Sequence, residues 1–192
     1  MTGPSDSLRL FGPFELVHHG ESVTLGQPRL EELVALLATR PGHSMPRTQI
    51  AYHFWPDSNE KQARTNARVL LYRLRNTWPG MAEAIAIDRT TITWRRDAPI
   101  VVDVQRFQDL LTQADQSDTA EDRVRLLTNA ADCYQGDLLP SCYADWALEA
   151  REQLRSRYST VLEQLVDALL ELRQYDKALH RAKQLRDHDP LR

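Results

Sequence analysis

The feature that most limits the fold is a change in hydrophobic pattern near residue 100. Before it, short alternating runs accompany segments with helical period, whereas beyond Asp103 almost every segment has the period of a helix. The chain has 192 residues, enough for one domain or two small ones with a real core. We therefore predict an α+β domain over residues 1–100 and an all-α domain over 101–192, with the boundary in the segment 97–103.

The first domain is predicted to open with a small antiparallel sheet. Its strands are short, apolar or alternating runs separated by Gly-Pro and Gly-Glu turns, at residues 8–12, 14–19 and 22–25. A two-stranded hairpin is predicted later, over residues 85–96, where alternation continues on both sides of a short polar turn. Between the sheet and the hairpin the period is that of helices.

Three helices are predicted between the sheet and the hairpin, at residues 28–42, 46–56 and 57–78. Pro28 suits the first turn of the first helix, and Ser44 could cap the second. Asp57 is a good cap for the third, with Glu60 three residues later as in a capping box. Strands, three helices and a hairpin in this order are the layout of a winged helix-turn-helix.

The second domain is predicted to contain four helices, at residues 102–115, 121–136, 143–174 and 175–189. The last one has the shape of a tetratricopeptide unit, with Tyr175 at its start, Ala178 and Ala182 at close-packing positions and Pro190 as its terminator. A helix pair that stops there would leave an apolar face uncovered, so we expect the sequence to be the N-terminal piece of a longer protein.

Composition excludes several classes of protein. No apolar run approaches the ~20 residues that span a bilayer, and the N-terminus has no signal-peptide pattern. The two cysteines, Cys133 and Cys142, have no CxxC partner, which favours reduced thiols in a cytoplasm over a disulfide between them. No nucleophile elbow, phosphate-binding glycine loop or HExxH is present, so we expect neither an enzyme nor a cofactor.

Histidines do not form a recognisable metal site in the sequence. His18 and His19 are adjacent on a predicted strand, so their side chains are expected on opposite faces of the sheet. His180 and His188 lie about two helical turns apart without a carboxylate or cysteine to complete a set. The four tryptophans are interpreted as core or hinge residues, with Trp55 packing under the third helix.

Positive charge is concentrated on the third helix, although the chain as a whole is acidic, with 24 Lys+Arg against 27 Asp+Glu. Residues 59–78 carry five basic residues and one acid, Glu60. When successive residues are placed 100° apart around the helix axis, an apolar stripe forms one side of the helix, and the other sides carry polar and basic residues. The stripe comprises Ala63, Ala67, Leu70, Leu71, Leu74 and Trp78. The residues expected to contact DNA are Lys61, Arg64, Thr65, Arg68, Val69, Tyr72, Arg73, Arg75 and Asn76.

These residue types suit a helix that enters the major groove. Lys and Arg neutralise phosphates, Arg and Asn can read guanine and adenine, and Thr and Val offer methyl groups to thymine. Because this segment has one acidic residue and five basic ones, ion pairs within the helix cannot be the main role of the basic residues. The hairpin adds Arg89 at or near its tip, where it could enter a narrow minor groove. The alternative interpretation is a solvated basic surface.

The sequence also resembles a known family. The stretch RLFGPFELVHHGESVTLG and the later FWPDSNEKQARTNARVLLYRLRNTW look like the N-terminal half of bacterial transcriptional activators of the antibiotic-regulatory (SARP-like) type. The core of the match is Trp55-Pro56-Asp57, Ala63-Arg64 and Arg73-Leu74-Arg75. From Asp103 onward, with VDVQRF at the junction, the chain resembles the bacterial transcriptional activator domain (BTAD), which is built from tetratricopeptide-like helices.

The resemblance implies an OmpR-type winged helix followed by a BTAD domain in a sequence-specific transcriptional regulator. It also implies double-stranded DNA as a partner, side-by-side protomers on direct repeats, recruitment of RNA polymerase, and no membrane. We expect helix 57–78 in the major groove and hairpin 85–96 near the minor groove. The alternative is a protein-interaction module whose winged helix is a docking surface that does not bind DNA.

Overall fold

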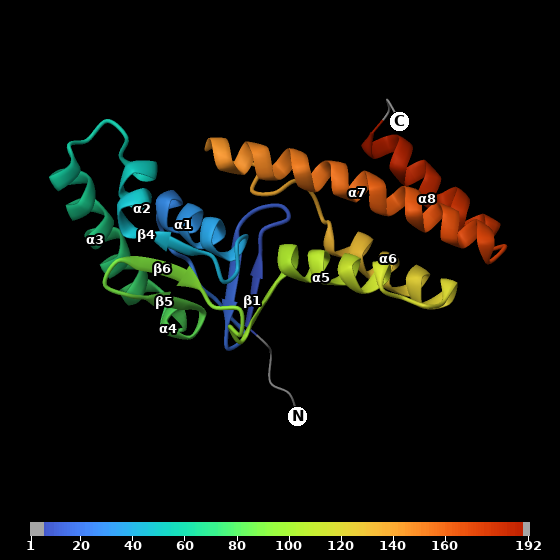
Figure 1. Ribbon diagram of the computed structural model, residues 1–192, viewed down its shortest axis with the longest axis horizontal. Helices are drawn as coiled ribbons and strands as arrows, with labels where there is room; N and C mark the ends of the chain where they lie inside the picture. The colour runs from blue at the N-terminus through green and yellow to red at the C-terminus, as the bar shows by residue number, and fades with distance from the viewer. Residues whose placement is uncertain (1–5, 190–192) are drawn as a thin grey trace. The chain divides into compact units, whose positions relative to one another are not determined.

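A computed structural model describes residues 6–189 of the chain and divides it into two compact units (Figure 1). One unit runs from Phe14 to Val102 and includes the chain up to Leu8; the other begins at Asp103 and also includes Arg9–Pro13. Each unit is described by itself. The predicted terminator Pro190 lies outside the described residues. The expected fold class, an α+β unit followed by an all-α unit, is confirmed.

The first unit contains a four-stranded sheet rather than the three antiparallel strands that were predicted. Strand β7 was missed, because it lies in the segment interpreted as the boundary, and it pairs with β1 in parallel, with Leu8 opposite Val102. Both of these side chains are buried. The strands lie in the order β3-β2-β1-β7. They are β1 (Asp6–Arg9), β2 (Glu15–His18), β3 (Glu21–Ser22) and β7 (Ile100–Val102).

Three helices follow as predicted, α1 (Pro28–Ala38), α2 (Arg47–Phe54) and α3 (Glu60–Thr77). Pro28 is in the first turn of α1, as expected. Ser44 is not the cap of α2: it lies in strand β4, and its hydroxyl hydrogen-bonds the hydroxyl of Thr93 at 2.9 Å.

The start of α3 differs from the prediction by two residues. Asn59 is the cap, and its side-chain oxygen accepts a hydrogen bond of 2.9 Å from the backbone N–H of Gln62. Asp57 lies before the helix because a turn, with Ser58 N–H donating to the carbonyl of Trp55, comes first. Glu60 does not reach back to complete a capping box and instead pairs with Arg64 one turn later.

The apolar stripe of α3 is buried as predicted. Each of its six members is at most 6 % exposed. Ala63 and Ala67 form a small cluster with Ala51 of α2, and Trp55 packs against this cluster. Small side chains at these positions let the two helices approach closely, so α2 fixes which side of α3 is left facing solvent.

The predicted hairpin is present and is joined by a third strand. After a short helix, α4 (Met81–Ala84), strands β5 (Ile85–Ile87) and β6 (Thr91–Trp94) pair antiparallel. The missed strand, β4 (Ser44–Pro46), pairs with the other edge of β6. Because β4 leads directly into α2, this sheet ties the hairpin to the helices.

The second unit contains the four predicted helices, α5 (Asp103–Asp115), α6 (Ala120–Cys133), α7 (Asp145–Glu171) and α8 (Tyr175–His188). Consecutive helices pack on one another, as in stacked helix pairs. Tyr175 begins α8 and Ala178 is buried against α7, as the tetratricopeptide pattern predicted.

A segment from the start of the chain completes the helical unit. The backbone N–H groups of Leu10 and Phe11 donate to the carboxylate of Asp103 at 2.8–3.0 Å, and the Phe11 ring packs on Phe107 and Tyr134. Burial raises the pKa of Asp103 even though these N–H groups favour its charged form. That residues 9–13 belong to the helical unit was not predicted, since residues 8–12 were interpreted as one strand.

Candidate nucleic-acid interface

The outer face of α3 is open to solvent along its whole length. Tyr72 is 67 % exposed and Val69 is 44 % exposed. All nine α3 residues expected to contact DNA are exposed. The DNA-binding hypothesis needs this exposure.

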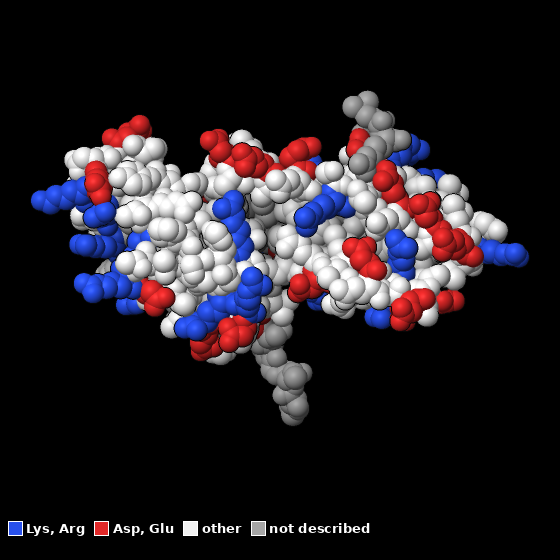
Figure 2. All heavy atoms as spheres, in the orientation of Figure 1, with Lys and Arg blue, Asp and Glu red and all other residues white. Residues whose placement is uncertain are grey.

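Most of the positive charge on this face is not neutralised by neighbours. Arg64 pairs with Glu60 at 2.5 Å, and Arg73 donates to the side-chain oxygen of Gln27 at 3.2 Å. Within residues 6–189, Arg68 has no ion pair or side-chain hydrogen bond. In Figure 2 the Lys and Arg side chains project along the side of the molecule where Figure 1 places α3.

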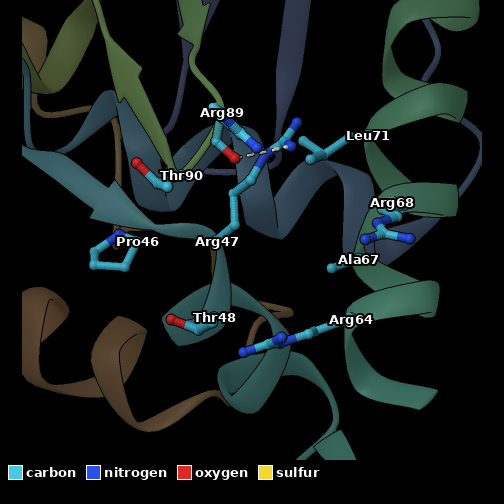
Figure 3. Close-up of a pocket in the computed structure, with 9 residues that line it drawn as sticks. All are labelled: Pro46, Arg47, Thr48, Arg64, Ala67, Arg68, Leu71, Arg89 and Thr90. Atoms are coloured by element: carbon cyan, nitrogen blue, oxygen red, sulfur yellow. Dashed lines mark hydrogen bonds between the residues drawn. The ribbon is translucent and has the colours of Figure 1, made fainter. Parts of the chain in front are cut away.

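A cavity of about 360 Å³ lies between α3, the start of α2 and the tip of the hairpin (Figure 3). Its floor is apolar, from Ala67 and Leu71, and its rim carries guanidinium and hydroxyl groups. The residues that line it are Pro46, Arg47, Thr48, Arg64, Ala67, Arg68, Leu71, Arg89 and Thr90. Three of the predicted contact residues, Arg64, Arg68 and Arg89, are therefore brought together by the fold.

Arg47 is a site residue that sequence reasoning missed. Its backbone N–H donates to the carbonyl of Thr90 at 2.8 Å, which fixes the start of α2 against the hairpin turn. Its guanidinium lies 3.5 Å from the carbonyl of Arg89 (Figure 3), and its Nε is buried without a hydrogen-bond partner among the described residues. Only the pairing of β4 with β6 brings Arg47 here, so no local sequence signal could have found it.

The electrostatics of the cavity favour an anion. Four arginines line it, and one of them, Arg64, is paired with the carboxylate of Glu60. Like charges held this close repel one another, and the repulsion is relieved when a phosphate accepts hydrogen bonds from several guanidinium groups. A second hollow over the first turns of α3 is lined by Asn59, Glu60, Lys61, Arg64, Thr65 and Arg68. The basic surface therefore continues toward the N-terminus of the helix, where the helix dipole also favours anions.

The other predicted contact residues lie outside the cavity. Lys61 and Thr65 border the second hollow, and the hydroxyl of Thr65 donates to the carbonyl of Lys61 at 2.9 Å. The side chains of Val69, Tyr72, Arg73, Arg75 and Asn76 line neither hollow and are exposed on the middle and C-terminal turns of α3. A groove-reading surface would therefore span most of the helix.

Residues outside this surface have other environments. Trp78, Trp94 and Trp146 are buried, as expected for core residues. Cys133 and Cys142 are not joined to each other by a disulfide, and burial raises the pKa of Cys133. Among residues 6–189, no helix is both long and apolar enough to cross a membrane.

The expectation for the adjacent histidines was wrong. His18 ends β2, but His19 lies in the turn that follows, at φ 52°, and the centroids of the two rings lie 4.0 Å apart. The argument that they must occupy opposite faces of a sheet fails because only one of them is in the strand.

Comparison with known proteins identifies the helical part of the chain. Residues 102–192 match the family model of the bacterial transcriptional activator domain. A solved structure of Mycobacterium tuberculosis EmbR in complex with a low-affinity phosphopeptide is similar to 95 % of this chain, with a TM-score of 0.63 and 15 % identity. The chain spans 59 % of the length of that EmbR chain. No curated protein matches the sequence.

Proposed function

We propose that this chain, a SARP-like protein whose residues 102–192 form a bacterial transcriptional activator domain, is a sequence-specific DNA-binding regulator, most simply an activator. The observation that supports DNA binding is the convergence of Arg47, Arg64, Arg68 and Arg89 on one cavity beside an exposed helix face. No active-site function is needed to explain these residues.

The DNA would be held by α3 and the hairpin together. With α3 in the major groove, Arg68 and Asn76 can hydrogen-bond purine edges, and Thr65 and Val69 can contact thymine methyl groups. A backbone phosphate beside the groove would lie over the cavity, within reach of Arg47 and Arg64. Arg89, exposed at the hairpin turn, would contact either a phosphate or the adjacent minor groove.

The two parts of the chain would have different functions. Residues 1–100 would bind DNA, and residues 101–192 would serve for self-association on direct repeats or for contact with RNA polymerase. The charges agree with this division, since residues 1–100 hold 12 basic and 10 acidic residues and residues 101–192 hold 12 and 17. A net negative half is repelled by nucleic acid and is better suited to a protein partner.

The alternative function is a protein-docking surface on the same face. Val69 and Tyr72, one turn apart on α3, are both strongly exposed. Aromatic and arginine side chains are enriched at protein interfaces, so this face could bind a protein without binding DNA. The two functions differ in their dependence on salt and on the arginines.

A gel-shift experiment against genomic fragments separates the two functions. We expect binding that weakens steeply between about 50 and 200 mM salt and that is lost in Arg68→Ala. Arg157→Ala, which removes an exposed arginine from α7, is the matched control and should bind like the wild type. DNA affinity that is unchanged in Arg68→Ala, together with tight binding to a protein, would favour the docking surface.

A further inference from the structure

The turn between β2 and β3 brings two imidazoles and a carboxylate together. His19 and Gly20 are its two central residues, with φ of 52° and 83°, and His18 is paired with Glu21 across the ladder. Positive φ at both central positions is the type I′ geometry of tight hairpins. It turns the ring of His19 back toward His18 and toward Asp6 on the neighbouring strand β1.

Asp6 is held in place by both histidines. One carboxylate oxygen accepts a hydrogen bond of 2.7 Å from the backbone N–H of His19 and lies 3.8 Å from its Nδ1. The other oxygen lies 2.5 Å from Nδ1 of His18. One side-chain atom from each of the three residues lies within 4.8 Å of the other two, and this is the group of metal-binding type found among residues 6–189.

These distances suit a tetrahedral metal ion. Bonds of 2.0–2.1 Å to a tetrahedral centre place neighbouring ligand atoms about 3.3 Å apart. The separations from the two imidazole nitrogens to the carboxylate oxygens nearest them, 2.5 and 3.8 Å, lie on either side of that value. With one ligand atom from each residue already within 4.8 Å of the other two, changes of side-chain rotamer would bring all three around one ion. The carboxylate–His18 hydrogen bond would be exchanged for two metal bonds.

The surroundings leave the ligands space and access. The side chains of Asp6 and His18 are only 15 % and 12 % exposed, so their neighbours restrict them to few other conformations. Gly80 makes room for the His18 ring, because a Cβ at that position would lie 2.7 Å from its Cε1. His19 is 80 % exposed and gives an ion a path from solvent.

We propose that Asp6, His18 and His19 form a binding site for a transition-metal dication of the Zn²⁺ class, with the remaining coordination position taken by water. Two imidazole ligands select zinc, copper or nickel over magnesium and calcium, which prefer oxygen. The ion would join β1 to the β2–β3 turn and stabilise the sheet. The proposal does not depend on DNA binding, since none of the three residues belongs to the α3 surface.

Calorimetric titration of the protein with ZnCl₂ at pH 7 tests the proposal. We expect saturable one-to-one binding and a melting temperature that rises with zinc. His19→Ala and Asp6→Asn should each weaken the binding by about tenfold or more, since loss even of a group that only orients a metal ligand costs about 10–100-fold in metal affinity. His43→Ala removes another exposed histidine and should leave the affinity unchanged.

His19→Ala is the decisive variant because the exposed His19 side chain can be removed with little effect on packing. A zinc-free melting temperature equal to that of the wild type would show that the variant folds. The proposal fails if the wild type shows no saturable zinc binding, or if His19→Ala and Asp6→Asn bind zinc as tightly as the wild type does.

Discussion

Arg47→Ala and Arg89→Ala should each make DNA binding less sensitive to salt. Every phosphate that a cation neutralises contributes about −0.9 to the slope of log K against log salt. Arg68 is assigned to base edges, so if the three other arginines around the cavity engage phosphate, they contribute a slope of about −2.7, which is an affinity loss of about 40-fold between 50 and 200 mM salt. With one of these arginines removed, that loss falls to about 12-fold.

Arg64 should show the smallest change in slope among Arg47, Arg64 and Arg89. It is already paired with Glu60 at 2.5 Å, so transferring it to a phosphate gains less than for an arginine without an acidic neighbour. Arg47 has no such partner, and its backbone hydrogen bond to Thr90 remains in Arg47→Ala, so the hairpin should keep its place. The difference between these two variants therefore reports on the cavity itself.

Fluorescence anisotropy at four or more salt concentrations would measure the slopes, with a duplex chosen by genomic footprinting. Arg157→Ala is again the control for loss of one positive charge outside the surface. The reasoning is refuted if Arg47→Ala and Arg89→Ala keep the wild-type slope, even if both bind more weakly. Equal slopes of log K against log salt in these variants and the wild type would mean that neither arginine neutralises a phosphate.

Three further predictions concern stability and can be measured by chemical denaturation. Asn59→Ala removes the cap of α3 and should lower the free energy of unfolding by about 1 kcal/mol, whereas Asp57→Ala should have little effect. Asp103→Ala leaves the buried N–H groups of residues 10 and 11 without their acceptor and should cost about 3 kcal/mol; a smaller loss than Asn59→Ala would contradict this. Burial raises the pKa of Asp137, but hydrogen bonds from Arg155 and Tyr134 outweigh burial and hold that pKa below its usual value. Arg155→Met should therefore be less stable than the wild type at pH 7, by at most about 1 kcal/mol because the pair is partly exposed, and the difference should disappear as the pH falls through the lowered pKa of Asp137. A difference that persists at low pH would assign the loss to packing.

The order of elements and the buried side of α3 could be predicted from sequence because both follow from local periodicity. Leu70, Leu71 and Leu74 recur at helical spacing, and their burial follows wherever the helix packs. The solvent-exposed side of α3 then consists of the residues that are not part of this buried stripe. Local sequence was therefore enough to predict the elements and their order, but not the pairing of strands that lie far apart in the chain.

What was missed depends on pairing between distant segments or on a few backbone angles. Strands β4 and β7 are three residues each, too short for alternation to be recognised, and their partners lie more than 40 residues away. Arg47 enters the cavity only through the β4–β6 pairing. His19 was misplaced because strand periodicity was extended one residue into the turn. Asp57 and Asn59 are equally good caps by residue type, and the turn at Trp55–Ser58 decides between them.

The crossing of residues 9–13 into the helical unit has a consequence for dissecting the protein. The polypeptide enters that unit twice, so no single cut separates the two parts intact. A fragment starting at Asp103 would lack the two N–H donors to its first carboxylate and the Phe11 ring, and a fragment ending at Val102 would carry that pentapeptide with nothing to receive it. Domain exchange with a related protein would therefore have to transfer the pentapeptide together with the helices.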